Sequence, residues 1–332
     1  MAHIFFCVEC RKEAEYEIRI SKYFHSIKGK EYNFKITEAL CKECGEKINL
    51  PGLMDQNAKE IDEQYRQIKD LVSVEDIEAL MNIYNIGKAP LSLALGFGEI
   101  TITRYLNGQY PSEEYSSIIR KALSSPDYMM ECLDKYRNKI ANTAYVKSYE
   151  AALQLKKILN SVSEKMLITI SYIFEKTNEV TPLALQKLLY YIQALYMISY
   201  GKPLFDEECQ AWLHGPVYEA VYNIFKNFKY NPIDDRRFYI FKNKFQKLSE
   251  DEKRIIDLVL DSFGMYSGKT LEKLTHKEAP WSEAFNDVCI CGYTNEIISK
   301  ESIYNYFKEV SNSFNLNTES GINQYIRKQL DC

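Results

Sequence analysis

Hydrophobic and polar residues alternate in two stretches near the start of the chain. In residues 14–20 the even positions are apolar or aromatic and the odd positions are charged, and residues 32–36 repeat the alternation. A period of two residues is typical of β-strands with one buried face. The polar break at residues 26–30 predicts a hairpin between strands at 14–20 and 32–40.

From residue 55 onward the period becomes helical. Apolar side chains recur three or four residues apart, so they share one face of a helix; these are Ile61, Tyr65, Ile68 and Val72. The same pattern predicts further helices at residues 74–84, 112–124, 126–137 and 145–159. Residues 160–164 read as a boundary, after which a second helical region begins.

The second region is predicted to be mainly helical. Thr181 followed by Pro182 is a typical helix start, and Gly201 is a typical stop, so residues 182–200 form a strongly apolar, buried helix. Further helices are predicted at 166–174, 216–228, 249–262, 267–274, 301–310 and 322–330. The run Phe238–Phe241 predicts one short strand.

Four cysteines near the N-terminus have the spacing of a metal site. Cys7 and Cys10 form one CxxC pair, and Cys41 and Cys44 form another about thirty residues later. Two such turns facing each other supply the four thiolates that structural Zn²⁺ favours. The alternatives are a labile disulfide pair or four buried thiols. With all four positions filled by cysteine, the predicted role of Zn²⁺ is structural.

Composition limits the possible partners and compartments. The chain has 332 residues, 26 tyrosines and a net charge of −4. Global charge therefore gives no support to nucleic-acid binding, and any DNA contact must come from a local patch. The N-terminus lacks the basic and apolar segments of a signal peptide, and the apolar run at 166–174 is too short to span a bilayer. We expect a cytoplasmic protein with no membrane partner.

Residues 87–111 have the pattern of a helix-turn-helix. A short helix buries Leu91, Ala94 and Leu95, Gly96 permits a left-handed turn, and a second helix ends at Gly108. The second helix turns Ile102 and Leu106 inward. Its predicted DNA-facing residues are Glu99, Thr101, Thr103 and Arg104. Arginine and small hydroxyls suit a major-groove face; the alternative is an ordinary helical hairpin in a bundle.

The segment from Cys7 to about Leu133 resembles MqsA-type antitoxins, in which a zinc module precedes a Cro/repressor-like helix-turn-helix. The resemblance rests on both CxxC pairs, on Leu50-Pro51-Gly52-Leu53, and on Leu95-Gly96 followed by Thr103-Arg104-Tyr105. It implies that Arg104 reads DNA. The asparagine that also reads bases in that family is replaced by Ile100. Such proteins bind two half-sites, so the resemblance implies a homodimer.

Residues from about Glu164 to Phe307 resemble the Panacea domain, also called the SocA-like antitoxin domain. Two ordered strings carry the resemblance: Leu-Gln-Lys-Leu-Leu-Tyr-Tyr at 185–191 and His-Gly-Pro-Val-Tyr at 214–218. Domains of this family neutralise toxins and have no established catalytic activity. The predicted toxin-facing residues are Trp212, His214, Tyr218, His276 and Trp281. For the tryptophans and histidines the alternative is structural, with Pro216 opening a helix behind them.

Two other patterns are weaker. Residues 264–270 resemble a phosphate-binding loop but are one residue short of the required spacing and do not follow a buried strand. Cys289 and Cys291 with His276 form an incomplete ligand set, so a second metal site is not expected. We expect no enzyme activity.

The sequence thus predicts a mainly α protein of three parts and a tail. These are a zinc-binding β-hairpin module (residues 1–54), a helix-turn-helix domain with flanking helices (55–160), a helical Panacea domain (161–312) and a tail (313–332). The predicted function is that of a type II antitoxin, which binds a cognate toxin protein and represses its own operon at operator DNA. The alternatives are a transcriptional regulator without a toxin and a protease adaptor for a toxin.

Overall fold

The computed structural model describes residues 4–285 and 296–331. Its internal contacts divide the chain into two units. The first consists of Met1–Met81 and Ile86–Tyr145, and the second of Asn82–Asn85 and Val146–Cys332. None of the helices within the described ranges is both long enough and apolar enough to cross a membrane.

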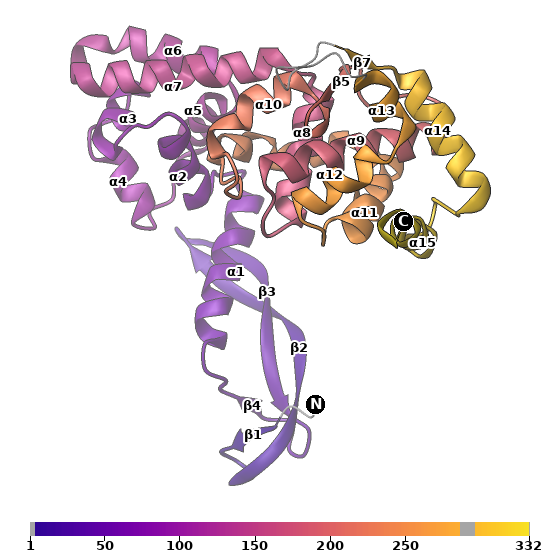
Figure 1. Cartoon of the computed structure of the whole chain (residues 1–332). Helices are drawn as coiled ribbons and strands as arrows, with labels where there is room; N and C mark the ends of the chain where they lie inside the picture. The colour runs from indigo at the N-terminus through magenta and orange to yellow at the C-terminus, as the bar shows by residue number, and fades with distance from the viewer. Residues whose placement is uncertain (1–3, 286–295, 332) are drawn as a thin grey trace. The chain divides into compact units, whose positions relative to one another are not determined.

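The first unit begins with an antiparallel sheet of four strands in sequential order (Figure 1). The strands are β1 (Ile4–Cys7), β2 (Lys12–Ile27), β3 (Lys30–Cys41) and β4 (Lys47–Ile48). The predicted hairpin is confirmed and is longer than the alternation indicated. It closes through a turn of two residues, Lys28 and Gly29, with φ values of 51° and 77°, which match the type I′ turn that suits twisted strands.

The free edge of β3 is covered by α1 (Leu53–Ile68), which lies beside that strand (Figure 1). The Asn57 amide accepts a hydrogen bond from the Thr37 N–H at 2.9 Å and donates one to the Thr37 carbonyl at 2.8 Å. The Gln64 amide makes the same pair with Lys35, at 2.8 and 2.7 Å. A spacing of seven residues keeps both amides on one helix face. They occupy the backbone groups that a neighbouring strand would otherwise use.

Short helices complete the first unit and confirm the helical predictions for this region. They are α2 (Val74–Ile83), α3 (Lys88–Ala94), α4 (Thr101–Leu106), α5 (Glu113–Ser124) and α6 (Pro126–Lys135). Ser112 and Ser125 cap α5 and α6 by accepting hydrogen bonds from backbone N–H groups, as short polar side chains do at helix starts. A 3₁₀ turn (Arg137–Lys139) and α7 (Asn142–Ser161) follow.

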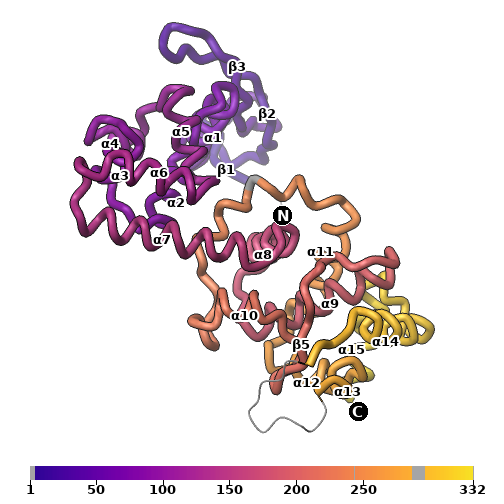
Figure 2. The backbone as a smooth tube through the Cα atoms, turned by 90° about the horizontal axis from the view of Figure 1, so that it is seen from above, coloured from indigo at the N-terminus to yellow at the C-terminus, as the bar shows by residue number. Residues whose placement is uncertain are grey.

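The second unit is built around α9 (Pro182–Tyr200), which is buried over most of its length. Thr181 caps its start, and Gly201, at φ 69°, ends it, as predicted. Figure 2 shows α9 together with α11, α14 and α15. The surrounding helices are α8 (Glu164–Lys176), α10 (Glu219–Phe225), α11 (Glu250–Phe263), α12 (Gly268–His276), α13 (Ala279–Phe285), α14 (Lys300–Ser313) and α15 (Glu319–Asp331).

The predicted strand at Phe238–Phe241 is wrong, because these residues lie in a 3₁₀-helical segment, Arg236–Lys247. Aromatic residues favour strands in general. Here Phe238 and Phe241 are both buried, with ring centroids 5.6 Å apart. A helix with three residues per turn places positions i and i+3 on the same side, so this spacing suits the 3₁₀ form.

The predicted start of a helix at Pro216 is also wrong. Gly215–Val217 forms strand β6, which pairs with β5 (Cys209–Trp212), and α10 begins only at Glu219. The small sheet has the order β6-β5-β7, with β7 at Ile297–Ile298. Proline is tolerated in a strand at a sheet edge, where its missing N–H is not needed.

A buried carboxyl ties the C-terminal helix to α9. Tyr191 of α9 and Tyr325 of α15 both donate hydrogen bonds to one oxygen of Glu278, at 2.9 and 2.7 Å. Burial raises the pKa of Glu278 to about 7, although the tyrosine hydroxyls oppose the shift. The predicted helix at residues 322–330 is confirmed as α15, and Tyr325 anchors it in this buried cluster.

The raised pKa of Glu278 predicts a pH-dependent stability. The folded pKa of about 7 exceeds the ordinary value of 4.5, so the carboxyl's contribution is complete below pH 4.5 and is lost as the pH rises through 7. The total is roughly 3 kcal/mol. We therefore expect Glu278→Gln to gain stability relative to wild type between pH 5 and pH 7.5.

Denaturation followed by tryptophan fluorescence measures this effect, because both tryptophans lie in the second unit. Glu283→Gln, which removes an exposed carboxyl of α13, is the matched control. A difference between Glu278→Gln and wild type that stays constant across this pH range would contradict the prediction.

Candidate functional site

The two sequence strings of the second unit meet at one corner of the fold. We define the corner as residues 212–218, which contain the turn between β5 and β6. Gln186 of α9 accepts a hydrogen bond from the Tyr218 N–H at 2.8 Å and donates one to the Tyr218 carbonyl at 3.4 Å. Lys187 donates to the Pro216 carbonyl at 2.9 Å. Both α9 side chains are buried, so the corner backbone satisfies polar groups that would otherwise be costly in an apolar interior.

Gly215 allows the corner backbone to lie this close to Lys187 of α9 and to Thr275 of α12. Its φ is 94°, a value that side chains rarely permit. A Cβ atom here would lie 2.7 Å from the Thr275 hydroxyl and 2.8 Å from the Lys187 ammonium nitrogen. Both the backbone conformation and the space therefore require glycine.

Burial has a strong effect on Lys187. Desolvation lowers the pKa of its amine to about 7, since removing a cation from water disfavours the charged form. The Pro216 carbonyl is the acceptor for the amine in either protonation state. Nearby, burial raises the pKa of the Cys209 thiol to about 12, so that thiol stays protonated and unreactive at neutral pH.

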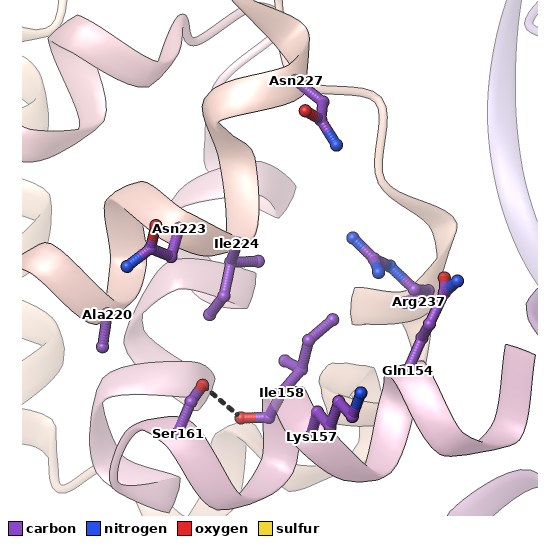
Figure 3. A pocket seen from close by; sticks show the side chains of 9 residues that line it. All are labelled: Gln154, Lys157, Ile158, Ser161, Ala220, Asn223, Ile224, Asn227 and Arg237. Atoms are coloured by element: carbon purple, nitrogen blue, oxygen red, sulfur yellow. Dashed lines mark hydrogen bonds between the residues drawn. The ribbon is translucent and has the colours of Figure 1, made fainter. Parts of the chain in front are cut away.

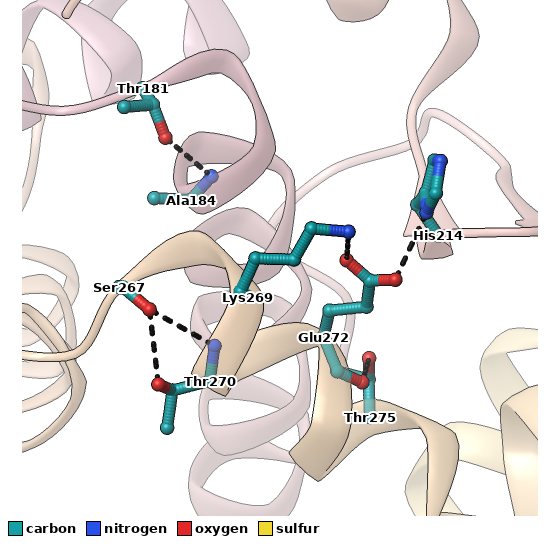
Figure 4. Close-up of polar contacts among 8 residues, drawn as sticks. All are labelled: Thr181, Ala184, His214, Ser267, Lys269, Thr270, Glu272 and Thr275. Atoms are coloured by element: carbon teal, nitrogen blue, oxygen red, sulfur yellow. Dashed lines mark hydrogen bonds and ion pairs between the residues drawn. The ribbon is translucent and has the colours of Figure 1, made fainter. Parts of the chain in front are cut away.

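An ion-pair cluster lies at the surface of the corner (Figure 4). Glu272 of α12 contacts the His214 Nδ1 at 2.9 Å through one oxygen and the Lys269 amine at 2.9 Å through the other. Burial raises the pKa of Glu272, but hydrogen bonds from the His214 and Lys269 side chains outweigh this effect and hold the pKa below its usual value. The side chains of His214 and Lys269 are 59% and 69% exposed, whereas that of Glu272 is 12% exposed.

A hydrogen bond joins the corner to α13, and aromatic stacking joins α13 to α12. The Trp281 indole N–H donates to the Trp212 carbonyl at 2.9 Å. The His276 ring stacks on Trp281 with ring centroids 3.9 Å apart. Burial lowers the pKa of His276, and its Nε2 has no hydrogen-bond partner among the described residues.

The five predicted toxin-facing residues thus occupy different environments. His214 is exposed, Trp212 and His276 are half-buried, and Trp281 and Tyr218 are buried. The structure brings His214, Trp212, His276 and Trp281 around the corner, while the backbone of Tyr218 is held from inside. Sequence reasoning missed Gln186, Lys187 and Glu272. Two consecutive polar residues inside a largely apolar helix were the available signal for the first two.

A cavity of about 480 Å³ lies elsewhere in the second unit, between α7 and α10 (Figure 3). Arg237 at its rim is held by Asp235, through bonds of 2.8 and 2.5 Å. Its other polar lining residues are Gln154, Lys157, Ser161, Asn223 and Asn227. It lacks the buried charged groups that converge at the corner, so we assign it no function.

The four predicted metal ligands come together in the first unit. The sulfur atoms of Cys7 and Cys44 are 3.5 Å apart, those of Cys10 and Cys41 are 3.8 Å apart, and all four lie within 4.8 Å of one another. A tetrahedron with Zn–S bonds of about 2.3 Å has sulfur–sulfur edges of about 3.8 Å. The cluster is therefore compatible with a four-thiolate metal site. Cys289 and Cys291, considered above with His276, lie outside the described residues.

The two helices predicted as a helix-turn-helix are present as α3 and α4. Ser92 of α3 accepts a hydrogen bond from the Ile102 N–H at 3.0 Å, and Ile102 is fully buried. Gly96 has φ 77°, and a Cβ there would lie 2.6 Å from the Tyr136 hydroxyl. Among the predicted DNA-facing residues, Glu99 and Arg104 are exposed, and Thr101 and Thr103 are half-buried.

Comparison with known proteins finds similarity within the second unit. Residues 185–282 match the family described as "Antitoxin SocA-like, Panacea domain". The chain is also 41% identical over 46 residues to "Antitoxin SocA" of Caulobacter vibrioides (strain NA1000 / CB15N), which is 14% of this chain and 24% of that protein. The chain thus spans about a quarter of the length of this curated relative. No solved structure matches the chain.

The matched segment contains most of α9, the corner and α12, which supports the resemblance predicted for this region. The resemblance of the N-terminal part to MqsA-type antitoxins stays a prediction.

The corner geometry predicts an unequal effect of two glycine substitutions. Gly215→Ala and Gly201→Ala both place alanine at a positive φ, which costs roughly 1–3 kcal/mol. Only Gly215→Ala also overlaps Lys187 and Thr275, because the space around Gly201 is open. We expect Gly215→Ala to lower the free energy of unfolding more than Gly201→Ala, as measured by tryptophan fluorescence in denaturant. Equal losses would contradict the packing described here.

Proposed function

We propose that this chain is the antitoxin of a type II toxin–antitoxin system and neutralises a cognate toxin by direct binding through its Panacea domain. The observation that carries the proposal is the match of residues 185–282 to the SocA-like antitoxin family. Neutralisation is then stoichiometric, by covering the active surface of the toxin. It needs no catalytic group in the antitoxin.

The corner is the proposed toxin-binding surface. His214 and Lys269 expose charged or polar groups there, and Glu272 fixes both. Because Gln186 and Lys187 hold the corner backbone from inside, little conformational entropy is lost when a partner binds. In this proposal Trp212 and His214 contact the toxin. Tyr218 and Trp281 are buried, and together with the half-buried His276 they position these two residues.

Co-expression with the product of the adjacent gene, each under its own inducer, tests the proposal. We expect that product alone to stop growth and this chain to restore it. The double variant His214→Ala/Lys269→Glu should bind the toxin at least about tenfold more weakly, since truncating an interface hot spot costs about 2 kcal/mol or more and Lys269→Glu also reverses a charge. Tyr230→Ala, which alters an exposed residue elsewhere in the same unit, should bind normally.

Other outcomes favour the alternatives. A harmless neighbour, together with retained DNA binding, contradicts the antitoxin function and favours a regulator without a toxin. A toxin that is degraded rapidly only when this chain is present favours a protease adaptor.

We infer that Cys7, Cys10, Cys41 and Cys44 hold one structural Zn²⁺. The support is the cluster geometry and its complete set of four thiolates, which leaves no position for water or substrate. A small sheet with a short buried core takes much of its folding free energy from such a metal. The core beside the cluster is indeed small, comprising Cys7, Ala14, Ala39, Cys41 and Ile48.

Zinc removal should therefore unfold the N-terminal sheet, β1 to β4, and leave the second unit folded. We expect about one equivalent of Zn²⁺ in the purified protein. Cys41→Ser should abolish binding and unfold the sheet, as seen by faster amide exchange in β1 to β4. Tryptophan fluorescence should not change, because both tryptophans lie in the second unit. A metal-free wild-type protein with a protected sheet would contradict the inference.

We further propose that α3 and α4 form a helix-turn-helix through which a homodimer represses its own operon. The support is the exposed Arg104 on α4, the buried Ile102 behind it and the glycine turn between the helices. Glu99, Thr101 and Thr103 complete the proposed DNA-facing set. The operator is expected to be palindromic, with half-sites about one helical turn apart.

Arg104→Ala tests this assignment. Loss of a bidentate contact to guanine costs about 1–3 kcal/mol, so we expect operator affinity to fall at least about tenfold in a mobility-shift titration, with toxin binding unchanged. Lys30→Ala removes one exposed cation from the hairpin and is the control for charge alone. Equal effects of the two substitutions would remove Arg104 from the DNA contact.

A further inference from the structure

The two long strands of the hairpin differ in how their outer edges are covered. Asn57 and Gln64 of α1 occupy backbone groups on the outer edge of β3. β2 pairs with β1 only through Lys12–Glu15 and with β3 from Tyr16 to Ile27. Within the described part of the chain, no strand pairs with the other edge of residues 17–27. In Figure 1, β3 lies between α1 and β2.

This edge of β2 also carries exposed apolar side chains. Ile18, Ile20 and Phe24 are 51%, 71% and 66% exposed, and as alternate residues they share one face of the strand. The ladder with β3 runs without a bulge, and the strand contains no proline. Bulges and proline are among the features that protect such edges, as are charged side chains, of which this stretch has Glu17, Arg19 and Lys22. A long, regular and partly apolar edge without a bulge or proline is suited to pair with another strand.

We propose that the partner is a second copy of this chain, and that two β2 strands pair antiparallel about a twofold axis at Ser21. The two four-stranded sheets then form one continuous sheet of eight strands. This interface deepens the proposed function, because it rests on the homodimer proposed above and gives that dimer its contact surface.

The sequence of β2 is complementary to itself in this register. A twofold axis through Ser21 places Ile18 opposite Phe24 of the second copy, Arg19 opposite Tyr23, and Glu17 opposite His25. It also places Ile20 opposite Lys22, whose aliphatic stem can lie along the isoleucine. Each pair occurs twice. Apolar, cation–aromatic and acid–histidine neighbours across strands all stabilise a sheet. The rings of Tyr23 and His25 are stacked with centroids 5.9 Å apart. In this register they lie on the same strand face as Arg19 and Glu17 of the second copy.

Neighbouring registers are less favourable. A twofold axis normal to the sheet pairs odd-numbered residues with odd-numbered ones and even with even. It must therefore pass midway between the two copies of one residue, which is called the centre of the register here. Centres at Arg19 and Lys22 place like charges directly opposite each other. A centre at Ile20 places His25, Ser26 and Ile27 of the partner strand opposite residues 15, 14 and 13, where β1 already pairs. A centre at Ile18 brings the partner strand onto Lys12–Glu15, where β1 already pairs. A centre at Tyr23 leaves Glu17 and Ile18 unpaired, so the Ser21 centre is the one that uses nearly the whole free edge without placing like charges opposite each other.

Charge rescue tests both the interface and its register in the full-length protein. Ile18→Lys/Phe24→Lys places two lysines opposite each other in both symmetry-related pairs, so the dimer dissociation constant should rise at least about tenfold. Ile18→Lys/Phe24→Glu restores opposite charges in the same pairs and should recover dimerisation. Both variants change the same exposed positions, so they are matched for folding. Sedimentation equilibrium without DNA or toxin gives the constants, and amide exchange of the sheet checks the fold.

Cross-linking provides a second measurement of the same register. Residues at the twofold axis lie within about 5.5 Å of each other, which a disulfide can span. Ser21→Cys should therefore give a disulfide-linked dimer under mild oxidation, whereas Glu17→Cys and wild type should not.

The proposal is overturned if wild type is a monomer at micromolar concentration, or if it is a dimer that Ile18→Lys/Phe24→Lys leaves intact. It is also overturned if this edge is occupied only when the toxin is present. Toxin neutralisation measured on the same variants separates the two hypotheses. Loss of the dimer with neutralisation retained leaves the antitoxin function standing, and loss of neutralisation with the dimer retained contradicts only that function.

Discussion

The arrangement of the second unit depends on two buried polar side chains of one helix. Gln186 and Lys187 lie in the apolar helix α9, where each requires a hydrogen-bond partner. The backbone of Pro216 and Tyr218 supplies these partners. Gly215 permits the approach because it has no side chain. The need to satisfy two buried groups therefore fixes a surface turn, and through it the positions of the residues proposed to meet a toxin.

The same constraint explains what sequence reasoning found and what it missed at this site. The two strings were recognised, but their contact was not, because hydrogen bonds between distant segments leave no local period. Pro216 was interpreted as a helix start, since proline occurs both at helix starts and at sheet edges. The buried amine of Lys187, which donates to the Pro216 carbonyl, favours the strand, and its burial is a tertiary property. Glu272 was missed because a single carboxylate on a helix gives no pattern.

Prediction was more complete in the first unit, where the signals are local. The alternation in β2 and β3, the cysteine spacing and the glycine turn after α3 each arise within a few residues. The extent of the hairpin was underestimated because exposed residues on both faces of β2 interrupt the alternation. The amides of Asn57 and Gln64, which distinguish the covered edge of the sheet from the open one, could not be foreseen from residue types common on helix surfaces.

The most direct test of the central claim is hydrogen–deuterium exchange of the full chain, with and without the purified product of the adjacent gene. Binding through the corner predicts new protection in residues 209–218 and in α12, with the rest of the second unit little changed. Protection confined to other segments, or none at all with a product that is toxic, would contradict the account.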